Sequence, residues 1–194
     1  KILVTGSQGM VGSNLREVLL RLMATGKEKP GSEEDLAKLE AELGTSQNCN
    51  DFLEVFLSSA LASRGASLKF IGRQDCDLED PIAVSLFFKQ EQPTHVIHLA
   101  AKVGGLFANM QARAKFFESN TLINMNVLRA CQEINVERAV VMLSTCIYPD
   151  KVESYPIKEE WLHVGPPHPS NEGYAMAKRM CEVQCRLMNE AAGQ

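Results

Sequence analysis

Three glycines spaced three residues apart follow a short apolar run at the start of the chain. Ile2–Val4 leads into Gly6, Gly9 and Gly12, and apolar residues then recur at helical spacing from position 11 to position 22. The pattern predicts a buried strand that turns directly into a helix. In such a turn, one glycine permits the bend, a second lets a pyrophosphate come close to the backbone, and a third lets helix and strand pack. The phosphates would lie at the helix N-terminus. A glycine-rich turn with a purely structural role is the alternative interpretation.

The composition favours a cytoplasmic globular protein. The chain has 194 residues, of which 45% are hydrophobic, so it can bury a core. The net charge of −4 argues against nucleic acid as a partner, and no apolar run reaches the roughly 18 residues that a membrane span needs. No pair among the six cysteines has a zinc-ribbon spacing, so we expect reduced thiols and no metal site. They stand at positions 49, 76, 131, 146, 181 and 185.

Three further apolar segments predict strands that alternate with helices. They are Ser67–Ile71, His95–Ala101 and Ala139–Leu143, the last two nearly continuous and therefore expected to be buried. Asp80 and Pro81 predict the start of an intervening helix. A long helix that ends near residue 134 is then expected, with an apolar side that includes Phe116, Phe117 and Val127, and with asparagines at 120, 124 and 126. This order predicts a Rossmann-type doubly wound α/β fold around a parallel sheet.

A polar segment at residues 27–66 separates the first helix from the second strand. Ser32–Asp35 and Asp51–Glu54 resemble capping boxes, and each is followed by apolar residues at helical spacing. We interpret the segment as an inserted helical pair. A tolerated surface insertion and a partner contact are both compatible with it, because lengthening a loop costs little free energy.

The end of the second strand holds the residues expected to recognise the adenosine half of a dinucleotide. Arg73 stands where an arginine binds the 2′-phosphate of NADP and an acid would bind the 2′-hydroxyl of NAD. Asp77 and Leu78 are placed to lie along the adenine ring. Arg73 therefore favours NADP(H), and a solvated arginine at a strand end is the alternative.

Reactive side chains stand directly after the fourth predicted strand and at the start of the last predicted helix. Ser144 and Cys146 come at the strand end, and Tyr174 and Lys178 are one helical turn apart on one face. A tyrosine with a pKa of about 10 needs roughly 4 kcal/mol of phenolate stabilisation to titrate near pH 7, and a nearby ammonium supplies it. The pattern indicates acid–base chemistry.

With these residues assembled, the chain resembles the extended short-chain dehydrogenase/reductase family. The shared motifs, in the family's order, are Thr5-Gly-x-x-Gly-x-x-Gly12, His98–Ala101, Ser144 and Tyr174-x-x-x-Lys178. The resemblance implies an NADP(H)-binding domain over residues 1–194, with the 27–66 insertion. We expect these cofactor contacts: Gly6, Gln8, Gly9, Met10, Val11, Gly12, Arg73, Asp77, Leu78, Leu99, Ala100, Ala101, Tyr174 and Lys178.

Further motifs resemble the GDP-4-keto-6-deoxymannose epimerase/reductase group of that family. They are Ala101–Gly105, Ser144-x-Cys-Ile-Tyr-Pro149 and Pro169-x-Asn-x-x-Tyr-Ala175. The resemblance implies epimerisation of a keto sugar at C3 and C5, followed by reduction at C4 with NADPH. Tyr174 would protonate the C4 oxygen, Lys178 would lower the pKa of that tyrosine and hold the nicotinamide ribose, and Ser144 would bind the same oxygen. Cys146 would be the acid–base group of epimerisation; composition alone favours a small buried thiol.

The resemblance also implies parts that this chain does not carry. The group's second acid, a histidine, and the substrate-binding region lie beyond Gln194, while His163 and His168 are expected to be surface-loop histidines. The group's helical dimer seam implies a homodimer. Two other functions stay open: a nucleotide-sugar epimerase that retains its cofactor, and a non-catalytic dinucleotide-binding regulator.

Overall fold

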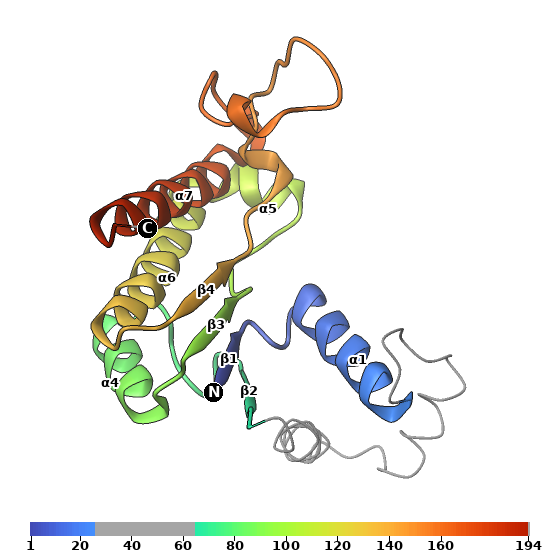
Figure 1. Cartoon of the computed structure of the whole chain (residues 1–194). Helices are drawn as coiled ribbons and strands as arrows, with labels where there is room; N and C mark the ends of the chain where they lie inside the picture. Colours follow the sequence, from blue (N-terminus) through green and yellow to red (C-terminus); the bar gives the residue numbers. More distant parts are fainter. Residues whose placement is uncertain (26–64, 194) are drawn as a thin grey trace. The chain divides into compact units, whose positions relative to one another are not determined.

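A computed structural model describes residues 1–25 and 65–193 of the chain (Figure 1). The predicted helical insertion, with its capping boxes at Ser32–Asp35 and Asp51–Glu54, lies outside the described residues apart from its last two positions. The described residues form two compact units. One contains the described residues 1–25, 65–76, 91–100 and 135–140, and the other contains residues 77–90, 101–134 and 141–193.

The first unit is built on a four-stranded sheet with the order β2-β1-β3-β4. Its strands are β1 (Ile2–Thr5), β2 (Leu68–Ile71), β3 (His95–His98) and β4 (Arg138–Val141). β1 pairs in parallel with both β2 and β3, in a register that sets Ile2 opposite Leu68 and His95. The predicted parallel sheet is therefore confirmed. Its core side chains, each at most 1% exposed, are Leu3, Val4, Ile71 and Val96.

The predicted strand–glycine–helix turn is present between β1 and α1 (Met10–Thr25). Gly6 has φ +75°, a conformation that favours glycine, and a Cβ there would lie 2.6 Å from the Ala100 backbone. A Cβ on Gly12 would lie 2.5 Å from the Gly6 carbonyl oxygen. Gly6 and Gly12 therefore allow the close packing that the motif predicts.

The apolar side of α1 differs from the prediction. Val11 and Val18, expected to pack, are both exposed. The buried Gly12 and the half-buried Leu15 and Leu19 follow one another at helical spacing, so they define the covered face. Val11 and Val18 each precede that stripe by one residue and lie at its edge.

Helices dominate the second unit. They are α4 (Pro81–Glu91), α5 (Leu106–Gln111), α6 (Arg113–Glu133) and α7 (Glu172–Ala191), with short 3-10 turns at Thr145–Ile147, Glu159–Trp161 and Pro169–Asn171. The predicted cap of α4 is confirmed, because Asp80 Oδ1 accepts hydrogen bonds from the Ile82 and Ala83 amides at 2.8 and 3.2 Å. In the described part of the chain, each helix is too short or too polar to cross a membrane.

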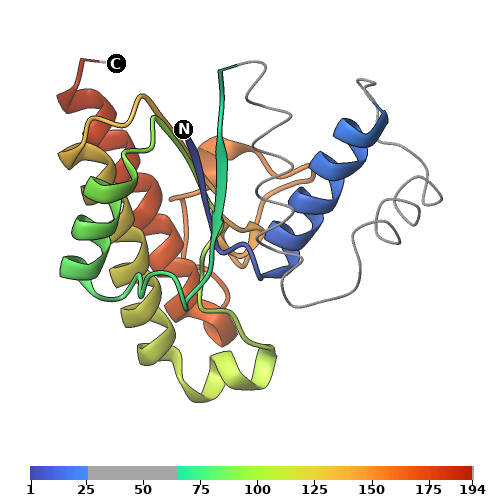
Figure 2. The ribbon, with the colours of Figure 1, turned by 90° about the horizontal axis from the view of Figure 1, so that it is seen from below.

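Helices α6 and α7 lie side by side (Figures 1 and 2). Small residues of α7, among them Gly173, Ala175 and Ala177, are buried, and the Ala177 carbonyl accepts from Asn124 Nδ2 of α6 at 3.5 Å. At Gly173 the backbones come so close that an added Cβ would lie 2.1 Å from the Arg113 carbonyl oxygen. The packing fixes the start of α7 against the start of α6.

Two other expectations are corrected. The segment Ala139–Leu143 was expected to be a buried strand, but Val140 is exposed because β4 is the last strand in the order of the described sheet. The predicted long helix is confirmed as α6, which is separated from α5 at Ala112, whose φ of −128° is not helical. Phe117, expected on the apolar side, is 37% exposed, whereas Phe116 is buried.

Candidate active site

A 3-10 turn after β4 carries two of the expected catalytic residues. Ser144 caps the Thr145–Ile147 turn, and its Oγ accepts hydrogen bonds from the Cys146 amide at 3.5 Å and the Cys146 thiol at 3.2 Å. The Ile147 amide donates to the Ser144 carbonyl at 3.2 Å. The hydroxyl and the thiol are therefore held beside each other by a short turn.

The first two turns of α7 carry the expected tyrosine and lysine. Tyr174 is partly buried and forms a side-chain hydrogen bond with Ser144. Lys178 is 1% exposed, and its Nζ donates to the Met142 carbonyl at 2.8 Å. Within the second unit, the structure thus brings together Ser144, Cys146 and Tyr174, and it places Lys178 against the backbone that leads into the turn.

The electrostatics at Tyr174 differ from the expectation. Burial raises the pKa of Tyr174 above its ordinary value, a negative charge on Cys146 raises it further, and the hydrogen bond with Ser144 lowers it. Burial lowers the pKa of Lys178, against the opposing effect of the Cys181 and Cys146 thiols. The Lys178 ammonium donates to a carbonyl, and burial, together with a negative charge on Cys146, raises the pKa of Tyr174 so that the phenol keeps its proton to higher pH.

Cys146 is distinguished from the other thiols by its place at the turn. All five described cysteines are free; Cys49 lies outside the described residues. Cys131, on α6, is buried, and burial raises its pKa to about 12. A raised pKa is typical of an inert structural thiol. Cys146 is only partly buried and contacts a hydroxyl.

The glycine turn in the first unit has room for a phosphate at one position. A Cβ on Gly9 would meet only the Gly6 carbonyl oxygen, at an ordinary 3.4 Å, so protein packing does not require glycine there. Gln8, Gly9 and Met10 are exposed. The turn therefore fits the expected role in which the second glycine leaves space for a pyrophosphate.

Polar contacts tie the glycine turn to the end of β3. Thr5 Oγ1 lies 2.7 Å from His98 Nδ1, and both side chains are fully buried. The Ala100 amide donates to the same Thr5 oxygen at 3.4 Å. His98 is therefore a structural member of its motif, and Leu99 and Ala100 are held close to Gly6.

The residues expected at the adenosine half lie at the end of β2 and beyond. Arg73 and Asp77 are exposed, and Leu78 is partly buried. The side chain of Gln8 lies close to Gly72, since a Cβ on that glycine would be 3.0 Å from Gln8 Cδ. Within the first unit, the glycine turn and the strand end that carries Arg73 are thus neighbours.

Buried amides of α6 hold the loops of the second unit, a role that the sequence did not reveal. Asn120 is fully buried; its Oδ1 accepts from the Lys102 amide at 2.8 Å and its Nδ2 donates to the Lys102 carbonyl at 2.9 Å. Asn126 Nδ2 donates to the carbonyls of Leu78 and Glu79 at 3.0 and 3.1 Å. The only signal in the sequence was the number of asparagines in one helix.

The two histidines of the long loop have structural partners. His163 Nε2 lies 2.8 Å from a carboxylate oxygen of Glu182, and His168 Nδ1 lies 2.7 Å from Ser170 Oγ. Both histidines are exposed, as predicted for surface-loop residues. They do not contact the Ser144 turn through these bonds.

Comparison with known protein families gives a match over nearly the whole chain. The model of the NAD dependent epimerase/dehydratase family matches residues 2–194. This chain belongs to that family. The membership and the relatives described next confirm the resemblance predicted from the glycine, serine and Tyr-Lys motifs.

Within the NAD dependent epimerase/dehydratase family, the chain is homologous to GDP-L-fucose synthases. It is 55% identical over 124 residues to GDP-L-fucose synthase of Dictyostelium discoideum, an alignment that covers 64% of this chain and 38% of that protein. It is 50% identical over 125 residues to a probable GDP-L-fucose synthase of Drosophila melanogaster, covering 64% and 39%. The chain thus matches well under half the length of these relatives.

A solved structure from the same group supports the fold. The GDP-L-fucose synthetase of Naegleria fowleri, in a crystal structure with bound NADP, matches with a TM-score of 0.68 and 34% identity. The match covers 98% of this chain and 44% of that one. The α/β fold with a parallel sheet is therefore that of one part of an epimerase-family protein.

Proposed function

We propose that the intact protein is an NADPH-dependent epimerase/reductase that converts GDP-4-keto-6-deoxy-D-mannose to GDP-L-fucose. The observation that carries the proposal is the cluster of Ser144, Cys146 and Tyr174 on one turn and one helix end, with Lys178 buried behind the turn. A thiol next to a hydroxyl and a protonated phenol suits proton transfer beside a ketone. The similarity to GDP-L-fucose synthases supports the choice of substrate.

Epimerisation comes first in the proposed reaction. The Cys146 thiolate removes a proton next to the ketone at C3 or C5, and Ser144 and Tyr174 donate hydrogen bonds to the enolate oxygen. A proton returned to the opposite face inverts the centre. Because a negative charge on Cys146 raises the pKa of Tyr174, the phenol keeps its proton while the thiolate acts as the base. The histidine acid of the group is not part of this chain.

Reduction at C4 completes the proposed reaction. Bound NADPH would supply the hydride. Tyr174 donates its proton to the C4 oxygen, and Ser144 keeps that oxygen oriented. Lys178, with three N–H donors and only one given to Met142, has donors left to hold the nicotinamide ribose.

We propose that NADP(H) is held by the fourteen residues named from the sequence. Gly9 leaves room for the pyrophosphate, and Arg73 lies at the strand end next to the glycine turn, where a 2′-phosphate would be recognised. The Naegleria relative binds NADP, which supports the choice of the phosphorylated cofactor. Residues 1–194 would form this cofactor domain, and the substrate-binding region would lie outside it.

A homodimer through α6 and α7 is part of the proposal. These helices border a groove of about 700 Å³ with a largely apolar lining that includes Met125, Met180 and Leu187. In the described chain, Thr121 Oγ1 and Arg179 Nη2 are buried without a hydrogen-bond partner, and both residues line this groove. A second copy would cover the apolar surface and supply acceptors.

Two substitutions separate the halves of the reaction. Cys146→Ser should suppress solvent deuterium exchange at C3 and C5 far more than hydride transfer to the already epimerised ketone, because serine is a much weaker base than a thiolate. Tyr174→Phe should abolish reduction and leave NADPH binding nearly intact, because only the proton donor is lost. Exchange is followed by NMR and reduction by NADPH absorbance. Equal losses in both steps for Cys146→Ser would contradict its assignment.

A further inference from the structure

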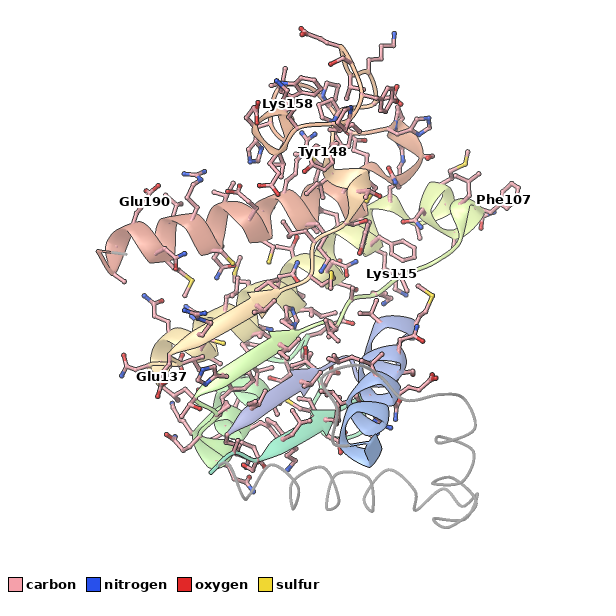
Figure 3. All side chains as sticks on the ribbon, turned by 45° about the vertical axis from the view of Figure 1, so that its right-hand side comes forward. Phe107, Lys115, Glu137, Tyr148, Lys158 and Glu190 are labelled. Atoms are coloured by element: carbon pink, nitrogen blue, oxygen red, sulfur yellow. The ribbon has the colours of Figure 1, made fainter. Side chains whose placement is uncertain are left out.

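Arg179 is a buried arginine that contacts the turn bearing Cys146. Its side chain is nine-tenths buried, and its Nε donates to the Ile147 carbonyl at 2.6 Å. Ile147 follows Cys146 directly and ends the 3-10 turn. Figure 3 shows Tyr148, the next residue, beside the N-terminal end of α7, while Glu190 lies at the opposite end of that helix.

The burial of Arg179 is not explained by an ion pair or by packing alone. Among the described residues, no carboxylate pairs with its guanidinium, and its Nη2 has no hydrogen-bond partner. Taking a cation out of water without a counter-charge is unfavourable. A methionine of similar length would fill the space without that penalty, so the arginine differs from it by its polar contacts: the hydrogen bond to Ile147 and, in the proposed homodimer, an acceptor from the second copy for Nη2.

Besides the bond of the Ile147 amide to the Ser144 carbonyl at 3.2 Å, the hydrogen bonds within the turn are long. The Cys146 amide reaches Ser144 Oγ at 3.5 Å, and the Tyr148 amide reaches the Thr145 carbonyl at 3.3 Å. A charge-assisted bond of 2.6 Å is stronger than either. The bond from Arg179 is therefore the shortest hydrogen bond described at this turn.

Two adjacent residues of α7 hold the backbone on both sides of Cys146. Lys178 donates to the Met142 carbonyl, two residues before Ser144, and Arg179 donates to the Ile147 carbonyl, one residue after Cys146. Ser144 lies two residues after Met142, whose carbonyl Lys178 contacts, and it also forms a hydrogen bond with Tyr174. Loss of the arginine contact should therefore move the thiol more than the hydroxyl.

We propose that Arg179 is a positioning residue for Cys146, which fixes the 3-10 turn through the Ile147 carbonyl and so directs the thiol toward the protons removed in epimerisation. The inference rests on the proposed function, because it assigns Arg179 to the epimerisation half of that reaction. Arg179 is not expected to touch the substrate.

The test compares three variants of the intact protein. Arg179→Met removes the donor and keeps the length, Arg179→Lys keeps a cationic donor, and Arg186→Met is the control on the same helix, where an exposed arginine pairs with Glu182 and Glu190. Deuterium exchange at C3 and C5 is measured by NMR with NADP⁺ present, and hydride transfer is measured with the epimerised ketone and NADPH. Thermal unfolding and NADPH affinity are recorded for each variant.

Arg179→Met should slow exchange by about tenfold or more, since a small misplacement of a reacting group can lower a rate by up to about a hundredfold. Hydride transfer and NADPH affinity should stay within about threefold, and Arg179→Lys should recover most of the exchange rate. If the methionine variant does not fold, Arg179→Gln, which removes the cationic donor, takes its place, and its exchange should be reduced selectively relative to Arg186→Met.

Three outcomes would overturn the inference: unchanged exchange in Arg179→Met, equal losses in exchange and hydride transfer, or a lysine variant as slow as the methionine variant. Cys146→Ser is run in parallel. Normal exchange in that variant refutes the proposed function itself, whereas suppressed exchange together with an unaffected Arg179→Met refutes only the role of Arg179.

Discussion

At the scale of single residues, two neighbouring cations on α7 donate to backbone carbonyls instead of carboxylates. Lys178 and Arg179 are both buried, and each has one short bond to the strand or turn that carries the candidate site. Burial lowers the pKa of both groups. Both charges therefore lie close to Ser144 and Cys146. Removing them from water costs free energy, and the hydrogen bonds to the carbonyls offset part of this cost.

The raised pKa of Tyr174 predicts how stability changes at alkaline pH. The folded state holds the phenol proton above the ordinary pKa of 10.0, so this contribution to stability is complete below pH 10 and is lost as the pH rises through the folded-state value. The difference in unfolding free energy between the wild type and Tyr174→Phe should be constant from pH 7 to pH 9 and should shift against the wild type above pH 10. Urea unfolding of both proteins across this range measures it. A constant difference up to pH 11 would contradict the raised pKa.

Arg73 is predicted to select the phosphorylated cofactor. Arg73→Ala should weaken NADPH binding by about ten- to a hundredfold, because a charge-assisted contact is worth roughly 1.5–3 kcal/mol. NADH, which lacks the 2′-phosphate, should bind with nearly the same affinity as before. Fluorescence titration with both cofactors gives the ratio, with the nearby Lys69→Ala as the control. An unchanged ratio would remove Arg73 from the cofactor site.

The sequence predicted the residues whose roles depend on local spacing. The three glycines, Asp80, and the Tyr174–Lys178 pair were recognised from their distances along the chain, and the structure places them on the expected turns and helices. The contacts of Arg179 and Asn126 were not predicted. Each reaches a carbonyl more than thirty residues away, and such a partner has no sequence signature.

At the scale of helices and strands, the beginnings of α6 and α7 approach each other closely at Gly173. Gly173 lies at the start of α7, directly before Tyr174, and it packs on the Arg113 carbonyl. This close approach of the two helix backbones fixes the position of the Tyr174 phenol. The exact start of α6 was not predicted, because nothing in the residue pattern marks the break at Ala112.

Gly173→Ala is therefore predicted to disturb both stability and catalysis. The added methyl would lie 2.1 Å from a carbonyl oxygen. Overpacking typically costs about 1–3 kcal/mol, of which the better helix propensity of alanine returns up to about 1 kcal/mol. Reduction should fall as Tyr174 moves. The control is Gly105→Ala, where an added Cβ meets no atom within 4 Å. Urea unfolding and NADPH oxidation are measured for both; equal stability of the two variants would contradict the packing account.

The exposure of β4 shows a limit of pattern reasoning for strands. The run Ala139–Leu143 is apolar, and an apolar run predicts burial on both faces. Val140 is nevertheless exposed at the end of the described sheet. Burial of such a strand depends on what packs beside it, which local composition does not encode.

At the scale of the whole molecule, the order of the motifs was more informative than any single one. Strand–glycine–helix, the apolar strands, the Ser144 turn and the Tyr-Lys helix occur in the sequence of one family, and that family's model matches residues 2–194. The relatives are more than twice as long as the stretch they share with this chain. The proposed conversion is therefore assigned to the intact protein, and Phe107 on α5 is an exposed apolar side chain (Figure 3).

The most direct test is NADPH oxidation by the intact protein after addition of GDP-4-keto-6-deoxymannose in deuterated water, with the sugar product identified by NMR. The account predicts NADPH consumption equal to the GDP-L-fucose formed, with deuterium at C3 and C5. NADPH binding without oxidation, or a reduced sugar that carries no deuterium at those two carbons, would contradict it.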